Sequence, residues 1–521
     1  MKQYILPVMT SIFLLSACVE DKGSYKNLPV NEVTVDKLEE DYSVIANVTE
    51  LDIKPEIKGT IEGSGNYDYT WYACRTALVD DGTAHNHTVL GREKDLKTVV
   101  DLAPGNYILY LSIVDKDTSL EWLFSTKLAV QTTLSIGFYV MGDKEDGTVA
   151  MDFLSMPTGG DSLIIKDIFV NEDALKGAED LLFSGNSYKS AAQDLWAVTE
   201  SGSFRVTNFV SQSSEFTVNK YFNENDIFFT MLEVKRPIKV LDMFPHQISG
   251  GKSLVYSSKG YISEDAIFVS SIILGEGFGN PINRYGLNST KLFKPYKRAF
   301  YQGGASYLRA IVYYDMDNEC FVTDNGGYSW SAGTCCVKLT DNPGDVFPWN
   351  QTNRTLVYGE NAANGYSYAL MKDKETAGKY YIYIFNAFMS SYLQKIGCYE
   401  MDIAKVPDFD KASAYAFFGA QPIVLYALGS QLWGYNYSKE TNRPVMIKDF
   451  GAEITYMAFD FISKESENDI LICTYDAANK GTIYKYEMKN DPNVVEMEPK
   501  ENCEWKTDLK VKKMEYRNSS Y

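Results

Sequence analysis

Apolar and polar residues alternate in short runs along most of the chain, and few stretches show the periodicity of a helix. Between residues 28 and 133 the runs NEVTVDKL, LDIKPEI, YDYTWYAC and PGNYILYLSIVDKD are separated by turn residues, and Val33 and Val35 share one face. Strict alternation predicts strands with one buried face. Strands at this spacing predict a small immunoglobulin-like two-sheet sandwich over 28–133.

Beyond residue 136 one pattern recurs, namely an apolar strand, a polar turn and an aromatic strand. The seven stretches begin 45 to 60 residues apart, at Gly137, Asp194, Ser253, Ile311, Tyr366, Tyr426 and Leu471. A hairpin repeated at nearly constant spacing predicts a β-propeller over 137–521, with each hairpin in the middle of a four-stranded blade. Seven blades are favoured over six or eight, and strands after Glu504 are expected to close the ring by pairing with blade material near the domain junction. A long β-helix is the main alternative, but its repeats are much shorter.

The first residues follow a different pattern. Lys2 precedes an apolar run that ends in small residues and Cys18. This layout predicts a secretory signal peptide over 1–17, which is too short to cross a membrane permanently. An ordinary signal peptide followed by a chance cysteine is the alternative.

The ending LSAC resembles a bacterial lipobox. The resemblance implies that Cys18 is the lipidated first residue of the mature chain, anchored in the outer membrane, with 18–27 as its tether. Glu20 and Asp21 resemble the acidic tag that exports lipoproteins to the cell surface in some Gram-negative anaerobes. We therefore expect an anchored protein that faces the cell exterior.

Composition agrees with an all-β protein and narrows its partners. The 521 residues include 38 Tyr, 27 Phe and 7 Trp, and aromatic side chains favour strands. The net charge of −19 repels nucleic acid phosphates and anionic headgroups, so nucleic acid is excluded as a partner. Seven of the eight cysteines follow Cys18, without CxxC spacing, and most are expected to be small buried apolar residues.

Candidate catalytic motifs fail on inspection. His85 and His87 lie in a polar loop without a nearby thiolate, and His246 is the one histidine of the propeller region. GYSWSAG and GYSYA lack the last glycine of a nucleophile elbow, and the SGGKS stretch precedes a strand where a phosphate loop needs a helix. DMDNE and DAANKG lack a full calcium-ligand series. We assign no catalytic residue, no metal site and no cofactor.

Two loops carry aromatic residues in glycine- or proline-rich surroundings. DNGGYSWSAG contains Tyr328 and Trp330, and DVFPWNQTN contains Trp349. Loop aromatics beside Asn, Gln and Asp suit stacking on sugar rings or peptide side chains. We therefore expect these three residues to be exposed and to contact a ligand.

The combination of YTWY, KDL and PGNYILYLSIVDKDT resembles the PKD-like domains at the front of surface lipoproteins. In that family the tryptophan and the Pro-Gly-x-Tyr corner belong to the core. The resemblance therefore implies that Trp71 and Tyr107 are packing residues. Such domains commonly hold a working domain away from the membrane.

Together the lipobox, the acidic tag, the PKD-like front domain and the propeller-like remainder resemble the PKD-like family lipoproteins of SusC/SusD-type nutrient-uptake loci. This implies an accessory protein beside a SusC/SusD-like TonB-dependent importer of oligosaccharide or oligopeptide. We expect a non-catalytic component that binds glycan or peptide or docks on the transporter. The alternative is a surface glycoside or peptide hydrolase that uses two of the 69 acidic residues at the propeller mouth.

Overall fold

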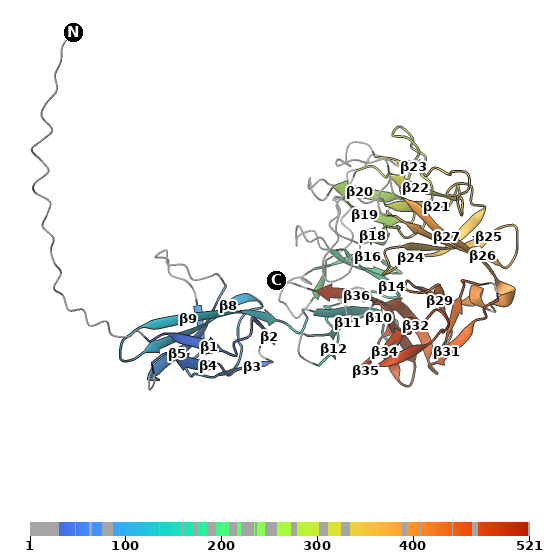
Figure 1. Ribbon diagram of the computed structural model, residues 1–521. Coiled ribbons are helices and arrows are strands. Elements are labelled where there is room, and N and C mark those ends of the chain that lie inside the picture. Colours follow the sequence, from blue (N-terminus) through green and yellow to red (C-terminus); the bar gives the residue numbers. More distant parts are fainter. Residues whose placement is uncertain are drawn as a thin grey trace, which may run out of the picture. The chain divides into compact units, whose positions relative to one another are not determined.

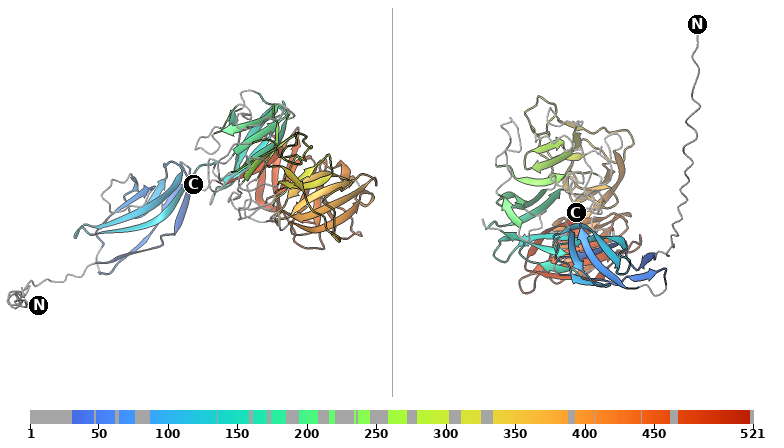
Figure 2. Two further views of the ribbon diagram at one scale, coloured as in Figure 1. Left: turned by 90° about the horizontal axis from the view of Figure 1, so that it is seen from above. Right: turned by 90° about the vertical axis from the view of Figure 1, so that its left-hand side faces the viewer.

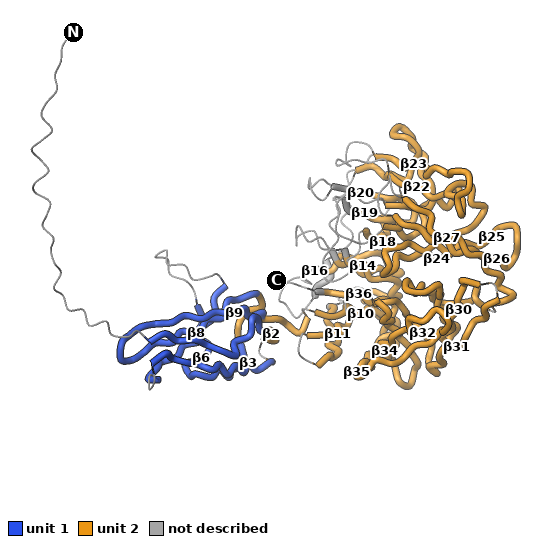
Figure 3. The backbone as a smooth tube through the Cα atoms, in the orientation of Figure 1, with its two compact units in different colours: residues 1–42, 49–100, 106–129 blue, residues 43–48, 101–105, 130–521 orange. Residues whose placement is uncertain are grey.

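The computed structural model describes most of the chain in two compact units (Figure 3). Unit 1 comprises residues 1–42, 49–100 and 106–129, and unit 2 comprises 43–48, 101–105 and 130–521. The described residues are 31–46, 48–61, 65–75, 87–134, 136–157, 161–170, 174–184, 194–207, 216–219, 234, 237–244, 258–271, 279–301, 311–324, 334–387, 393–406, 408–439, 441–460 and 467–518.

The described part of the chain consists of strands, apart from two single-turn 3₁₀ helices at Ile403–Lys405 and Phe409–Lys411. The protein is therefore all-β, as the aromatic-rich composition predicts.

The N-terminal strands form three antiparallel sheets, with orders β1-β4, β3-β7 and β2-β9-β8-β5-β6. They are β1 (Val33–Asp36), β2 (Asp41–Ile45), β3 (Glu50–Ile53), β4 (Glu56–Gly59), β5 (Tyr67–Cys74), β6 (His87–Gly91), β7 (Leu96–Val99), β8 (Gly105–Asp115) and β9 (Glu121–Gln131).

The core of these sheets uses the residues that the alternation predicts. Trp71 is fully buried, and its indole N–H donates to the carbonyl oxygen of Glu93 at 3.1 Å. Tyr107 is buried as well, and its hydroxyl accepts a hydrogen bond from Arg75. The prediction that Trp71 and Tyr107 are packing residues is confirmed.

Unit 2 contains seven sheets among its described residues, which we number in chain order (Figure 1). Sheet 1 has the order β12-β11-β10-β36, sheet 2 β13-β17-β16-β15-β14, sheet 3 β18-β19-β20 and sheet 4 β21-β22-β23. Sheets 5, 6 and 7 run β24 to β27, β28 to β31 and β32 to β35 in sequence order. Within sheet 2, the short β13 pairs in parallel with β17.

The strands of sheets 1 to 4 are β10 (Ile136–Asp143), β11 (Val149–Ser155), β12 (Leu163–Ile165), β13 (Phe169–Val170), β14 (Ala178–Ser184), β15 (Asp194–Thr199), β16 (Gly202–Thr207), β17 (Phe216–Asn219), β18 (Val240–Phe244), β19 (Ser258–Ser263), β20 (Ile267–Ser271), β21 (Val312–Asp315), β22 (Cys320–Asp324) and β23 (Cys336–Lys338). The remaining strands are β24 (Arg354–Asn361), β25 (Ser367–Asp373), β26 (Lys379–Asn386), β27 (Gln394–Asp402), β28 (Ala414–Phe418), β29 (Ile423–Leu428), β30 (Gln431–Asn436), β31 (Val445–Asp449), β32 (Glu453–Phe459), β33 (Asp469–Asp476), β34 (Lys480–Met488), β35 (Met497–Thr507) and β36 (Lys510–Asn518).

Hydrophobic clusters join each sheet to the next. Tyr139 and Phe183 join sheets 1 and 2, Trp196 and Phe268 join sheets 2 and 3, Phe244 and Tyr313 join sheets 3 and 4, and Phe321 and Phe385 join sheets 4 and 5. Tyr368 and Phe417 join sheets 5 and 6, Phe418 and Met457 join sheets 6 and 7, and Cys473 and Met514 join sheet 7 back to sheet 1. Among the described residues, a hydrophobic cluster therefore lies at each junction from sheet 1 to sheet 7 and between sheet 7 and sheet 1.

Sheet 1 is built from both ends of unit 2. The last strand, β36, pairs antiparallel with β10, the first strand of the unit, with Val140 opposite Met514. Figure 2 shows the red C-terminal segment beside the blue-green segment that begins unit 2. The expectation that strands after Glu504 pair with material near the domain junction is confirmed.

Six of the seven predicted hairpins are present, as β10–β11, β15–β16, β21–β22, β25–β26, β29–β30 and β33–β34. The third stretch, SLVYSSKGYISE, lies partly outside the described residues, which resume at residue 258. The prediction of a turn at its polar residues is wrong, because Lys259 and Gly260 lie inside β19, which pairs with β20. A Cβ on Gly260 would lie 2.0 Å from a ring carbon of Phe244, so this glycine serves close packing within the sheet.

Six of the seven sheets contribute one strand each to a set that lies against strands of the neighbouring sheets. β36 contacts β14 and β32, β14 contacts β18, and β28 contacts β24 and β32. The remaining gap is spanned by residues 295–300, because Ala299 N–H donates to Asp242 of β18 and Tyr301 N–H donates to Asn361 of β24. We call these seven segments the inner strands.

Candidate functional site

A pocket of about 530 Å³ lies where the loop after β23 meets the start of β27. This volume is within the range of small-molecule sites, which is about 300–1,000 Å³. The residues that line it are Lys338, Leu339, Thr340, Asn342, Gly344, Asp345, Val346, Trp349, Leu393, Gln394, Lys395 and Ile396. We call it the 339–349 pocket.

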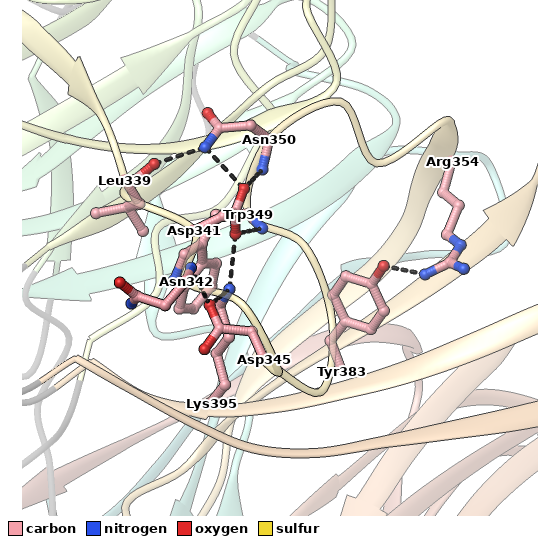
Figure 4. Close-up of polar contacts among 9 residues, drawn as sticks. All are labelled: Leu339, Asp341, Asn342, Asp345, Trp349, Asn350, Arg354, Tyr383 and Lys395. Atoms are coloured by element: carbon pink, nitrogen blue, oxygen red, sulfur yellow. Dashed lines mark hydrogen bonds and ion pairs between the residues drawn. The ribbon is translucent and has the colours of Figure 1, made fainter.

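Asp341 organises the loop that forms one wall of this pocket (Figure 4). One carboxylate oxygen accepts the backbone N–H of Trp349 at 2.6 Å, and the other accepts the backbone and side-chain N–H groups of Asn350 at 3.0 and 2.9 Å. The Asn350 amide also donates to the carbonyl oxygen of Leu339 at 2.6 Å. A single carboxylate therefore ties the two ends of the loop together.

Lys395 of β27 links this loop to sheet 5. Its Nζ lies 2.7 Å from Asp341 and 2.5 Å from Asp345, and only 6 % of its side chain is exposed. Burial raises the pKa of Asp341, but hydrogen bonds from Lys395, Trp349 and Asn350 outweigh it and leave the pKa below its ordinary value. The Lys395 hydrogen bond likewise lowers the pKa of Asp345. Both carboxylates are therefore ionised at neutral pH.

The expectation that Trp349 is exposed for stacking is wrong. Its side chain is 4 % exposed, and its ring centroid lies 5.2 Å from those of Phe321 and Phe385. The Lys395 ammonium stands 5.1 Å from the indole centroid, in cation–π range. The proline-rich loop folds back over the core between sheets 4 and 5, so Trp349 contributes to the base of the pocket and not to a stacking platform.

The other residues singled out from the sequence lie outside the described residues. These are Cys18, Glu20, Asp21, Tyr328 and Trp330, together with His85 and His246. His87 begins β6 and is exposed, with its ring 5.2 Å from that of Tyr72. The seven cysteines after Cys18 are all free thiols, and five of them are buried.

A second polar site lies on the inner strands. Arg298 donates to Asp180 of β14 at 2.7 Å and lies 3.7 Å from Asp242 of β18. Lys513 of β36 lies 3.8 Å from Asp180. Burial opposes the charged form of Arg298, but the two aspartates raise its pKa above the ordinary value. We call Asp180, Asp242, Arg298, Glu360 and Lys513 the axial cluster.

Glu360 of β24 belongs to the axial cluster because the charges of Arg298 and Lys513 act on its carboxyl. One oxygen accepts the Tyr358 hydroxyl at 2.6 Å, and the other accepts the backbone N–H of Phe417 from β28 at 2.5 Å. Burial raises its pKa to about 7, although these hydrogen bonds and the charges of Arg298 and Lys513 act in the opposite direction.

Solvent reaches part of the axial cluster. The exposed fractions of the Asp180, Arg298 and Lys513 side chains are 18, 26 and 18 %. Asp242, in contrast, is 2 % exposed. The carboxylates of Asp180 and Asp242 face the Arg298 guanidinium. The raised pKa of Glu360 is the property that a general acid needs.

Sequence reasoning did not single out Lys395, Asp341 or the axial cluster. Asp341 and Lys395 are 54 residues apart in the chain, and Arg298 and Asp180 are 118 apart. No local spacing marks such pairs. The Asp-Asn-Pro-Gly-Asp run at 341–345 indicates a turn, but it does not identify the side chains that contact the turn from elsewhere in the chain.

Two kinds of feature are absent from the described residues. No group of three or more His, Cys, Asp or Glu side chains there could hold a metal ion. In the same part of the chain, no helix has the length and apolar character needed to cross a membrane.

A protein-family model matches the N-terminal part of the chain. Residues 18–177 match the model of the PKD-like family. The match covers the N-terminal sandwich strands and continues through β10 to β13 of unit 2. No curated protein matches the chain.

Several solved structures from Bacteroides species are similar to the chain. A quinoprotein alcohol dehydrogenase-like protein from Bacteroides thetaiotaomicron is 11 % identical, with a TM-score of 0.37, over 91 % of this chain and 96 % of that one. A candidate 6-phosphogluconolactonase from Bacteroides uniformis is 8 % identical, with a TM-score of 0.33, over 86 and 99 % of the two chains. A third, from Bacteroides fragilis, has a TM-score of 0.32 at 8 % identity over 86 and 98 %. At these scores the likenesses carry no inference about activity.

Proposed function

We propose that the protein is a lipid-anchored protein of the outer-membrane surface that binds ligand for, or docks on, a SusC/SusD-type TonB-dependent nutrient importer. It does so without catalysing a reaction. Cys18 carries the lipid, Glu20 and Asp21 direct surface export, and the PKD-like region is a spacer. The PKD-like match supports this, because it begins at Cys18, the residue predicted to start the mature chain.

Unit 2 is, in this proposal, a seven-bladed β-propeller. Three observations support it: seven sheets, a hydrophobic cluster at each junction, and a C-terminal strand paired with the first strand of the unit. A closed ring of sheets buries every interior face and leaves only short edges exposed.

The ionisation of the acidic residues at the 339–349 pocket is the observation that favours a binding role over a catalytic one. Asp341 and Asp345 are both paired with Lys395, and both have lowered pKa values. A glycosidase needs one protonated carboxyl beside one ionised carboxylate. Two permanently ionised acids on one lysine can orient a ligand but cannot protonate a leaving group.

The test is an affinity pull-down of the native lipidated protein from detergent-solubilised outer membrane, with an unrelated surface lipoprotein as control. We expect a TonB-dependent transporter and its lid protein in the eluate. Mass spectrometry of the purified chain should find diacylglyceryl and N-acyl groups on Cys18. An unmodified Cys18, or recovery of the protein alone, would overturn the proposal.

Glu360 favours a second candidate function, a surface hydrolase. Its carboxyl has a pKa of about 7 and lies near Arg298 and Lys513, in a cluster that solvent partly reaches. In this alternative Glu360 is the general acid. Release of reducing sugar or of free amines by the purified protein, abolished by Glu360→Gln but not by Asp345→Asn, would favour it over the binding role.

A further inference from the structure

We propose that the 339–349 pocket binds a neutral saccharide. This inference rests on the proposed ligand-binding function and deepens it, because it assigns a site and a chemical class to the ligand. It depends on three properties of the pocket, namely its balanced charge, its free hydrogen-bonding groups and its mixed polar and aliphatic lining.

The charges at the pocket cancel. Lys395 is held by Asp341 and Asp345, and Lys338 supplies the second positive charge, with its Nζ 5.4 Å from the ring centroid of Tyr285. Two lysines and two aspartates leave no net formal charge for an ionic ligand to neutralise. The pocket as a whole therefore offers no net attraction to an ionic ligand, and a neutral ligand avoids the cost of removing a charge from water.

Several polar groups at the rim are uncommitted. Among the described residues, no hydrogen bond is made by the Thr340 hydroxyl, by the amides of Asn342 and Gln394, or by the Oδ1 atom of Asp345. They comprise a hydroxyl, two amides and a carboxylate oxygen, so donors and acceptors are both present. Such a set suits a ligand whose surface carries many hydroxyl groups, each able to donate and accept.

Aliphatic side chains lie between these polar groups. Val346 and Ile396 are 52 and 40 % exposed, and Leu393 is half-buried. Gln394 and Ile396 both belong to β27, and both line the pocket. A pyranose ring has hydroxyls around its edge and C–H groups on its faces, and it can use both kinds of surface at once.

The wall that presents these groups is rigid. Asp341, Asn350 and Lys395 hold the loop through hydrogen bonds of 2.6–3.0 Å, and Trp349 packs into the core beneath. A ligand therefore meets a preformed site and does not have to order the loop on binding, which reduces the entropic cost of association.

The experiment uses the full chain in isothermal titration and affinity electrophoresis. Dextran, mannan and xylan oligosaccharides are the neutral probes, polygalacturonate is the anionic probe, and a casein digest is the peptide probe. The test variant is Asn342→Ala/Gln394→Ala. The matched control is Gln421→Ala/Asn490→Ala, an exposed Gln–Asn pair outside the pocket. Thermal melting verifies that both variants fold.

We expect at least one neutral probe to bind, with affinity reduced about ten-fold or more in the test variant, because two hydrogen bonds are lost, and unchanged in the control. Preference for polygalacturonate or for the casein digest would overturn the inference. Equal binding by wild type and test variant would place the ligand elsewhere and also overturn it.

The outcome separates this inference from the proposed function. A failure of all saccharide probes, together with recovery of the importer in the pull-down, removes the saccharide assignment and leaves the surface role in place. Saccharide binding that depends on Asn342 and Gln394, without recovery of the importer, supports the saccharide assignment and removes the proposed role beside the importer.

Discussion

At the scale of single residues, the candidate pocket depends on Asp341 more than on the tryptophan that draws attention in the sequence. Asp341 accepts hydrogen bonds from two backbone N–H groups, an amide and an ammonium. Trp349 follows it in the chain and is buried by the loop that Asp341 closes. Because proline and glycine signal an irregular loop but not its direction, the sequence predicts the loop and misplaces its aromatic side chain.

Asp341→Asn is expected to lower the free energy of unfolding by about 1–3 kcal/mol, since one charge-assisted bond to Lys395 is lost and the amide can present a donor to backbone N–H groups. Urea denaturation of the wild type and the variant measures this difference in the free energy of unfolding. Asp345→Asn is the control, with a smaller effect, because Asp345 accepts only the bonds from Lys395 and Asn342. Equal effects would contradict the central role of Asp341.

Glu360 makes stability depend on pH. Its pKa is about 7 in the folded chain and 4.5 ordinarily, so the folded state holds this proton more tightly than the unfolded state. The stability that this tighter proton binding adds to the folded state is complete below pH 4.5 and is lost as the pH rises through 7. We expect Glu360→Gln to gain stability relative to wild type between pH 5 and 8, by up to about 3 kcal/mol. Parallel stability curves from denaturant titrations would contradict this.

At the scale of strands, hairpins are the part of the fold that sequence predicts best. Alternation and turn residues lie within about fifteen residues of each other, so both signals are local. The turn predicted in the third stretch is wrong because Gly260 allows close packing against Phe244 of β18 and does not mark a turn. The inner strands and the axial cluster were not predicted, because pairs such as Arg298 and Asp180 depend on how distant sheets meet.

Strand β36 provides a test of ring closure. Truncation before Lys510 removes the partner of β10 and takes Val511, Met514 and Tyr516 from the cluster between sheets 7 and 1. We expect loss of cooperative thermal unfolding and rapid proteolysis of unit 2. Truncation after Asn518 is the control and should behave as the full chain does. A cooperative transition in the shorter chain would show that closure by β36 is dispensable.

At the scale of the whole molecule, net charge bears on how the proposed membrane association would arise. With a formal charge of −19, the polypeptide is repelled by anionic headgroups, and the repulsion is strongest at low salt. The lipid proposed at Cys18 must therefore supply the whole attraction. The sequence predicts this anchor from a local pattern, whereas the ligand pocket needs the folded chain.

Cys18→Ala, expressed without its signal peptide, is expected to remain in the supernatant when it is sedimented with phosphatidylglycerol vesicles at low ionic strength. The natively lipidated protein should pellet with the same vesicles. Vesicle binding by the unlipidated variant would reveal a membrane-binding surface on the polypeptide itself and would weaken the case for a lipid anchor.

The pairing of β36 with β10 also constrains the order of events in the cell. Strand β36 is synthesised more than 360 residues after β10, so sheet 1 of a nascent chain stays unfinished until β36 has left the ribosome. Until then β10 exposes an open sheet edge and the apolar side chains that β36 covers. A frameshift within the codons for β36 would therefore harm this protein as much as a large internal deletion, although it alters only a few codons of the described part.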